Sequence, residues 1–264
     1  MENTELRALQ LDEVTVLDEL DRICKKHGLR YYLTAGTLLG AVRHGGFIPW
    51  DDDIDVAMPR EDYDRLYKIC KTELRDGFFF QCEKTERLHT FFFAKIRKDG
   101  THVTEHLLEG VDIHDGCYVD IFPLDKCPDK PKTAERFFKT VRMLNCAIIS
   151  KVNPSFKDGY TKRSAKFAYS IIKVLPFSLL RWLRHLTRKF YGSFASGKTL
   201  ATVAGSHGYP RESYDREWFS DAVPISFEGK EYPAPCGYRE LLTNMYGDYM
   251  TPPREDEQSG HFKE

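Results

Sequence analysis

Residues 31–58 read YYLTAGTLLGAVRHGGFIPWDDDIDVAM, and the rest of the chain is arranged around this segment. Near its end, acidic and apolar residues alternate from Asp53 to Val56, which is the period of two expected for a β-strand. Such a strand places the Asp53 and Asp55 carboxylates on one face and turns Ile54 and Val56 into the core. Two carboxylates on one face repel each other unless a cation lies between them, and oxygen ligands of this kind suit Mg²⁺, with Mn²⁺ as the alternative.

The first part of the segment predicts a phosphate-binding site. Tyr31–Thr34 favours a strand, and the turn at Gly36 and Thr37 leads into a short helix over residues 38–42. A strand that enters a glycine turn and then a helix exposes backbone N–H groups at the helix start, where phosphate oxygens bind. We therefore expect Gly36 and Thr37 to hold phosphate, and we add Arg43 as a nucleotide-binding candidate.

Two later β-favouring runs add charged residues to the predicted sheet. Lys95 and Arg97 alternate with Ile96 at the end of one run, so both side chains can reach the face that carries the aspartates. The other run, 117–122, has Asp120 at its centre, and a lone aspartate in an apolar strand is costly to bury unless it is paired, hydrogen-bonded or bound to metal. The three aspartates are the predicted catalytic and metal-binding set, with the two basic residues as phosphate ligands.

The composition is that of an ordinary globular protein, with 264 residues and a net charge of −1. The seven cysteines are scattered without a C-x-x-C pair, which favours a reducing compartment over a disulfide framework. The N-terminal residues lack the apolar region of a secretory signal, and no run of about eighteen apolar residues suits a membrane span. These features predict a cytoplasmic protein.

The charge is nevertheless uneven along the chain. Residues 151–200 hold eleven Lys or Arg against a single acidic residue, Asp158, and are also rich in aromatic and aliphatic side chains. A basic amphipathic segment of this kind is typical of a membrane-surface helix, although an ordinary solvated helix pair has the same pattern. We expect peripheral membrane contact, at the inner face, through residues 160–190. Nucleic acid is not an expected partner, because the apolar content is high for a phosphate-tracking groove.

One motif suggests a different phosphate-binding site. Residues 192–199 read GSFASGKT and match the phosphate-binding pattern G-x₄-G-K-T, with Lys198 as its lysine. A true P-loop follows a buried strand and opens a helix, whereas here a basic, helix-favouring run precedes the glycines. A P-loop NTPase is therefore kept only as an alternative.

Four strings together resemble the LicD family, which includes bacterial phosphocholine transferases and fukutin-related proteins. They are GTLLGAVRHGGFIPWDDDIDVAMPREDYDRL (36–66), FFFAKIRKDGT (91–101), YVDIFPLD (118–125) and YGDYMTPP (246–253). The resemblance implies an α+β fold, with a nucleotidyltransferase-like mixed sheet flanked by helices and a helical, basic insertion. It suggests a catalytic core over 1–130, the basic helical region over 131–215, and a C-terminal segment, 216–264, that packs back on the core.

The resemblance also implies an activity. Family members move a substituted phosphate from a CDP-alcohol donor onto a sugar, so we expect transfer of phosphocholine from CDP-choline to a glycan or lipid-linked saccharide, such as a precursor of teichoic acid or lipopolysaccharide. It assigns the Gly-Thr turn to Gly36 and Thr37, the D-x-D strand to Asp53 and Asp55, and the third carboxylate to Asp120. The alternatives are a nucleotidyltransferase that uses an NTP, a catalytically inactive nucleotide-binding subunit, and the P-loop NTPase.

Overall fold

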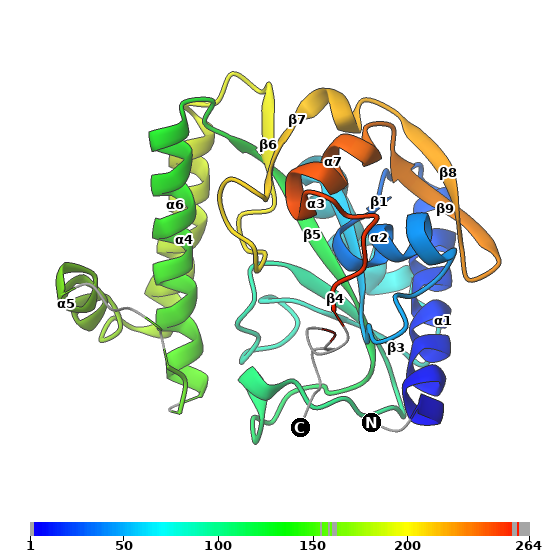
Figure 1. The fold of residues 1–264 in the computed structure, drawn as a ribbon. Coiled ribbons are helices and arrows are strands. Elements are labelled where there is room, and N and C mark those ends of the chain that lie inside the picture. The colour runs from blue at the N-terminus through cyan, green and yellow to red at the C-terminus, as the bar shows by residue number, and fades with distance from the viewer. Residues whose placement is uncertain (1–2, 154, 158, 160–162, 255–257, 259–264) are drawn as a thin grey trace.

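A computed structural model describes residues 3–153, 155–157, 159, 163–254 and 258 of the chain. A mixed sheet lies at its centre with helices packed around it (Figure 1). The strand order is β1 (Tyr32–Leu33), β2 (Ile54–Pro59), β5 (Tyr118–Cys127), β4 (Ala94–Lys98) and β3 (Phe78–Gln81), and β5 also pairs with β6 (Thr199–Ala201), which pairs with β7 (Ser213–Asp215). β2 and β5 run parallel, and the other neighbours run antiparallel. The predicted α+β fold with a mixed sheet is confirmed.

The helices and the remaining short elements surround this sheet. The helices are α1 (Asn3–His27), α2 (Ala35–His44), α3 (Arg60–Glu73), α4 (Pro131–Val152), α5 (Arg163–Ile172), α6 (Phe177–Gly192) and α7 (Tyr238–Tyr246), together with the 3-10 helices η1 (His106–Leu108) and η2 (Arg216–Phe219) and the hairpin β8 (Ala222–Phe227)–β9 (Lys230–Pro235). α4 packs along α6 at one side of the molecule, and α5 projects from this pair (Figure 1). α2 and α7 contact each other near the end of β2 that carries the aspartates.

The register of the central strands sets the positions of the charged side chains. Ile54, Val56 and Met58 of β2 are fully buried in the main core, where α1 and α3 contact this strand. The alternate residue Asp55 lies opposite Asp120 of β5, and Lys95 of β4 lies opposite the same aspartate. Because paired residues of neighbouring strands point to the same side, one row of charge crosses three strands of the sheet.

The region 131–215 is not helical throughout. It contains α4, α5 and α6, as expected, but β6 and β7 also lie in it and extend the central sheet through the end of β5. Strands of three residues are too short to give a periodic pattern, so the sequence carries no signal for them. The central sheet is therefore completed by residues far beyond position 130.

Among the described residues, no helix is both long enough and apolar enough to cross a membrane. The apolar side chains of α7 and of the β8–β9 hairpin, including Phe227, Tyr232 and Leu241, belong to the same core as β2 and β5. The described C-terminal elements thus form one hydrophobic unit with the N-terminal half of the chain.

Candidate active site

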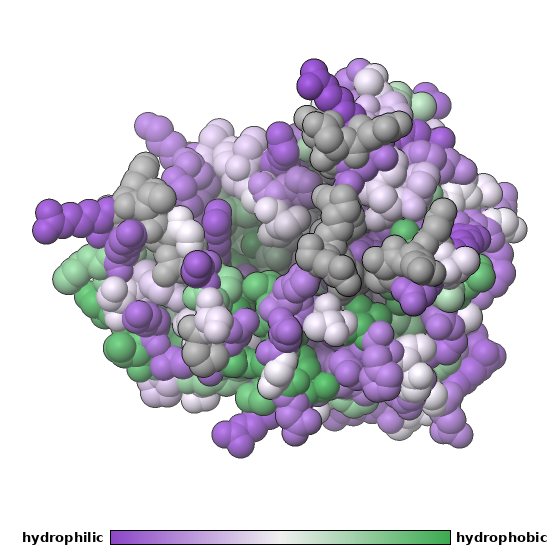
Figure 2. Space-filling model, turned by 60° about the horizontal axis from the view of Figure 1, so that its bottom comes forward, coloured by the Kyte–Doolittle hydropathy of each residue, from purple (hydrophilic) through white to green (hydrophobic). Residues whose placement is uncertain are grey.

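A cavity of about 690 Å³ lies over the charged row of the sheet. Figure 2 shows the molecular surface hollowed beside the helical layer on its left, with hydrophobic residues inside the hollow. The N-terminus of α2, the sheet face, η1, one side of α4 and the segment 202–214 form its walls. Five of the eight predicted site residues line this cavity: Gly36, Asp53, Asp55, Lys95 and Asp120.

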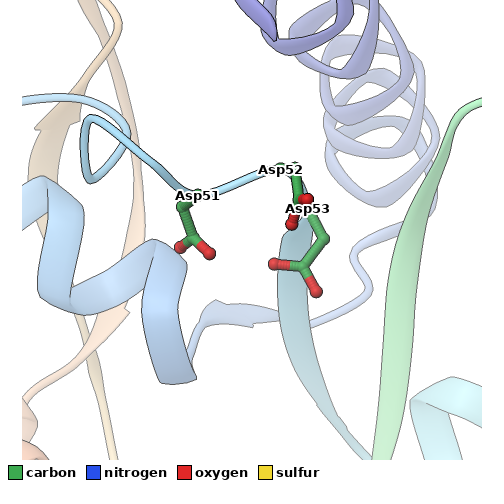
Figure 3. Close-up of side chains that lie close together, drawn as sticks. All are labelled: Asp51, Asp52 and Asp53. Atoms are coloured by element: carbon green, nitrogen blue, oxygen red, sulfur yellow. The ribbon is translucent and has the colours of Figure 1, made fainter. Parts of the chain in front are cut away.

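Three consecutive aspartates mark the start of β2. Carboxylate oxygens of Asp51, Asp52 and Asp53 lie within 4.8 Å of one another. Figure 3 shows the Asp53 carboxylate reaching toward that of Asp51, which comes from the loop ahead of the strand. Asp51 also lines the cavity. It was missed in the sequence analysis, although the spacing 51, 53, 55 continues the period of two that identified the other two aspartates.

Burial and mutual repulsion disfavour the ionised form of the carboxylates on this face. Burial, followed by the charges of Asp53 and Asp52, raises the pKa of Asp51 to about 8. Burial, Asp53 and Asp120 raise the pKa of Asp55 well above its ordinary value. Burial also raises the pKa of Asp120 to about 7, against the opposing effect of Lys95. Buried oxygen donors that repel one another are the environment that a hard divalent cation stabilises, so these residues fit Mg²⁺ or Mn²⁺.

Lys95 is the basic residue at the floor of the cavity. Its Nζ lies 2.7 Å from Oδ1 of Asp120 and 3.1 Å from Oε2 of Glu105, and it is 3.5 Å from the centre of the Tyr118 ring. The side chain is almost fully buried, so this geometry is fixed by its partners. Glu105, which lines the cavity from the loop before η1, carried no signal in the sequence, since it lies in an irregular polar segment.

Arg97 shares the face of Lys95 but does not reach the cavity. Its guanidinium donates to Oε1 of Gln81 and to the carbonyl of Gly116, both at 2.6 Å, and also to Glu105. The cavity covers only part of the sheet face, and Arg97 lies beyond its edge, against a second, smaller pocket. The expectation that Arg97 binds phosphate is therefore not supported by its position.

The N-terminus of α2 opens into the cavity. The helix begins at Ala35, earlier than expected, so Gly36 and Thr37 lie in its first turn. Its first helical hydrogen bond runs from the Leu38 N–H to the Thr34 carbonyl, so the amides of residues 35–37 have no acceptor within the helix. A Cβ on Gly36 would lie 2.6 Å from Oδ2 of Asp51, so a side chain there would displace the end of the Asp51 side chain.

Two other predicted phosphate ligands face away from this opening. Oγ1 of Thr37 accepts the N–H of Asp55 at 2.8 Å, and this bond ties α2 to β2. Arg43 donates to the carbonyl of Tyr249 at 3.1 Å and lies outside the cavity lining. Thr37 therefore positions Asp55, and Arg43 contacts the C-terminal segment.

The sequence GSFASGKT does not have the setting of a P-loop. α6 ends at Gly192, the first residue of the motif, and β6 begins at Thr199, its last. The order is thus helix, loop and strand, the reverse of the arrangement in which a P-loop cradles phosphate. Lys198 is also absent from the lining of the cavity.

Comparisons with known proteins place the chain in a family. Residues 28–134 match the family model described as LicD/FKTN/FKRP, nucleotidyltransferase domain. The whole chain is 30% identical to the lipopolysaccharide cholinephosphotransferase LicD of Haemophilus influenzae, of which it covers 98%. A segment of 35 residues, 13% of the chain, is 57% identical to the human ribitol 5-phosphate transferase FKRP and covers 7% of that protein. The resemblance stated from the sequence is confirmed, and the chain belongs to the LicD family.

Proposed function

We propose that this LicD-family phosphotransferase moves phosphocholine from CDP-choline onto a sugar hydroxyl of a cell-surface glycan precursor. The observation that carries the proposal is the row of Asp55, Asp120 and Lys95 across three strands, set in a large cavity beside Asp51 and Asp53. Similarity over the full length to a cholinephosphotransferase supports the choice of phosphocholine.

A divalent cation, Mg²⁺ or Mn²⁺, is part of the proposal. Asp53 and Asp55 would hold it, with Asp51 and Asp120 as the further carboxylates within the same cavity. When bound, the cation neutralises charge on the diphosphate of the donor and on the departing CMP. The charge balance of the lining favours cations, because the described residues of the lining include six carboxylates and one lysine: Asp51, Asp53, Asp55, Glu105, Asp120 and Glu212 against Lys95.

The protein's own groups would orient the two substrates. Amides at the start of α2 bind phosphate oxygens, because their N–H groups point out of the helix at its positive end. Lys95 holds the Asp120 carboxylate through its 2.7 Å hydrogen bond, and Asp120 either completes the cation site or takes the proton of the attacking hydroxyl. The sugar oxygen then bonds to phosphorus as the bond from phosphorus to CMP breaks.

Thermal unfolding with a panel of donors tests this proposal. In the presence of Mg²⁺, CDP-choline at about a hundred times its Kd should raise Tm by roughly 5–10 °C, while CDP-ribitol, CDP-glycerol, CTP and ATP should raise it less. The shift should vanish in Asp53→Asn and persist in Asp64→Asn, a matched change on the exposed part of α3. A shift with CTP or ATP alone would indicate a nucleotidyltransferase, and no shift with any of the five would overturn the proposal.

We also propose that α5 and α6 rest on an anionic membrane surface at the cytoplasmic face. The arginines of α6 do not provide the contact, because Arg181 and Arg184 turn inward to Glu83, and Arg188 to Asp125. The outward side of the helices is instead apolar and exposed, with lysines beside it. The exposed apolar residues are Phe167, Ile171, Val174, Leu179, Trp182, Leu186 and Phe190, and the exposed lysines are Lys166, Lys173 and Lys189.

Sedimentation with vesicles tests this contact. The protein should bind vesicles that contain phosphatidylglycerol at low salt and bind neutral vesicles weakly, since the lysines need anionic headgroups. Trp182→Ser should weaken binding, whereas Leu11→Ser, on the equally exposed surface of α1, should not. Binding that is identical in both variants would exclude α6 as the contact surface.

A further inference from the structure

Aromatic rings form the row next to the charged row on the same face of the sheet. Asp120 of β5 pairs with Lys95 of β4, and Ile121 pairs with Ala94. Phe122 follows this register on β5, and Phe93 directly precedes β4. Their ring centroids are 4.3 Å apart, and the Phe91 ring stacks on Phe93 at 5.0 Å. All three side chains line the cavity, and Phe91 and Phe122 are only partly buried.

These rings already lie close to one ammonium group. Nζ of Lys95 is 4.9 Å from the centre of the Phe91 ring and 5.4 Å from that of Phe93. That charge is balanced by Asp120 and Glu105, at 2.7 and 3.1 Å. The cavity as a whole still has more carboxylates than cationic side chains among its described lining residues. A further cationic group, beside Lys95 and the proposed divalent cation, is therefore electrostatically favoured in front of the rings, where aromatic faces attract it.

We infer that Phe91, Phe93 and Phe122 form the subsite for the trimethylammonium group of the donor. This inference rests on the proposed transfer of phosphocholine and assigns a position to its choline end. Phe122 is two residues from Asp120, a distance of about 6.6 Å along a strand. A phosphoryl group held at the aspartates therefore puts the ammonium, two carbons further on, beside the rings.

The segment that carries the rings is held in place from α6. Arg184 donates to the carbonyl of Thr90 at 2.9 Å and to that of Phe91 at 3.3 Å, and Arg181 donates to the carbonyl of His89. These bonds fix the backbone on the approach to β4. The aromatic subsite is thus formed before the donor arrives, which lowers the entropic cost of binding.

One polar group at this end favours a different ligand. Thr90 lines the cavity, is 1% exposed, and its hydroxyl has no hydrogen-bond partner within the described part of the chain. The hydroxyl oxygen has almost no accessible surface, so a polyol such as ribitol would bond to it only once a side-chain movement exposes it, whereas trimethylammonium has no group that donates a conventional hydrogen bond. Thr90→Val therefore separates the two ligand classes, because valine keeps the shape and removes the hydroxyl.

Calorimetric titration of the full chain with Mg²⁺ tests the subsite. The probes are CDP-choline and CDP-3,3-dimethylbutanol, in which a neutral tert-butyl group replaces trimethylammonium with the same shape. CDP-ribitol and CMP are titrated beside them. The parent protein should bind CDP-choline about tenfold more tightly than the neutral probe. Phe91→Leu and Phe122→Leu should remove most of this preference, because leucine retains apolar bulk but has no aromatic face. Phe79→Leu, a partly buried change on β3 outside the cavity, and Thr90→Val should leave it unchanged.

The outcomes distinguish this inference from the proposed function. The parent protein alone can overturn the subsite. If it binds CDP-choline and CDP-3,3-dimethylbutanol with equal affinity, the aromatic rings do not recognise the ammonium charge, although donor binding itself is intact. Equal weakening of both probes in the phenylalanine variants would also overturn the subsite. Preference for CDP-ribitol, lost in Thr90→Val, would assign this end of the cavity to a polyol. If neither probe nor CMP binds, the proposed function itself fails.

Discussion

Two buried clusters of charged side chains in this protein shift carboxyl pKa values in opposite directions. On the sheet face, burial and neighbouring carboxylates raise the pKa of Asp51, Asp55 and Asp120. Some distance away, Glu83 accepts hydrogen bonds from Arg184 and His185 and lies near Arg181; these partners overcome the effect of burial and lower its pKa to about 2. One group has an excess of like charge, and the other is a compensated ion-pair cluster.

The difference separates the carboxylates to which we assign ligand binding from a cluster whose charge is structural. Glu83 connects α6 to the segment before β4, and its charge is matched within the protein, so removing a partner should cost stability. The carboxylates on the sheet face keep a repulsion that the folded chain alone does not relieve, so removing one should cost activity instead. Variants of the two groups should therefore lose different properties, stability in one case and activity in the other.

Arg184→Met should give the largest change in stability. Arg184 is fully buried and bonds to Glu83, Asn145 and two backbone carbonyls. Its loss leaves Glu83 short of its buried partner, and we expect a destabilisation of about 3–5 kcal/mol in urea unfolding. Arg142→Met, an exposed change on α4, should be within about 0.5 kcal/mol of the parent. A small effect of Arg184→Met would mean that the cluster is not structural.

Asp53→Asn should show the reverse pattern. Under the proposed function, transfer of phosphocholine should fall about 10²–10³-fold, because charge on the departing CMP would lose the stabilisation that the cation supplies. The free energy of unfolding without Mg²⁺ should stay equal or rise, since a repulsive charge is removed from the face. Both are measured against Asp64→Asn, an exposed aspartate of α3. Clear destabilisation of Asp53→Asn without metal would contradict the contrast between the two groups.

Glu83 should give the protein a distinct response to acid. Its pKa falls from 4.5 to about 2 on folding. The ionised carboxylate therefore stabilises the folded protein fully above about pH 4.5, and this contribution is lost as the pH falls toward 2. A shift of this size corresponds to about 3 kcal/mol. Urea unfolding of the parent and of Glu83→Gln, followed from pH 7 to pH 3, should show a stability difference that shrinks with acid. A constant difference would show that the carboxylate charge contributes nothing.

The sequence predicted the sheet face better than the ion-pair cluster, for a physical reason. Alternation of acidic and apolar residues is a local pattern. It places Asp53 and Asp55 on one face of a predicted strand, and it places Asp120 at the centre of a second predicted strand. Arg184 lies in the basic segment for which the sequence predicts membrane contact, and its buried partner Glu83 is 101 residues away, which is too far for a local pattern to reveal. Arg97 has the correct periodicity, but the edge of the cavity depends on η1 and on Glu105, which no periodic pattern encodes.

Gly36→Ala tests whether Asp51 takes part in binding the cation, and it should change stability least among these variants. Alanine favours a helix more than glycine does, whereas the new methyl meets the mobile end of the Asp51 side chain, so the two effects should leave stability within about 1 kcal/mol of the parent. The displaced carboxylate should nevertheless weaken Mg²⁺ binding in calorimetric titration. Gly192→Ala, where the new methyl would lie 4.0 Å from the carbonyl oxygen of Lys126, should leave Mg²⁺ binding unchanged. Unaltered affinity in Gly36→Ala would mean that Asp51 only surrounds the cation site, and the carboxylates that bind the ion would then be those of the β2 and β5 strands.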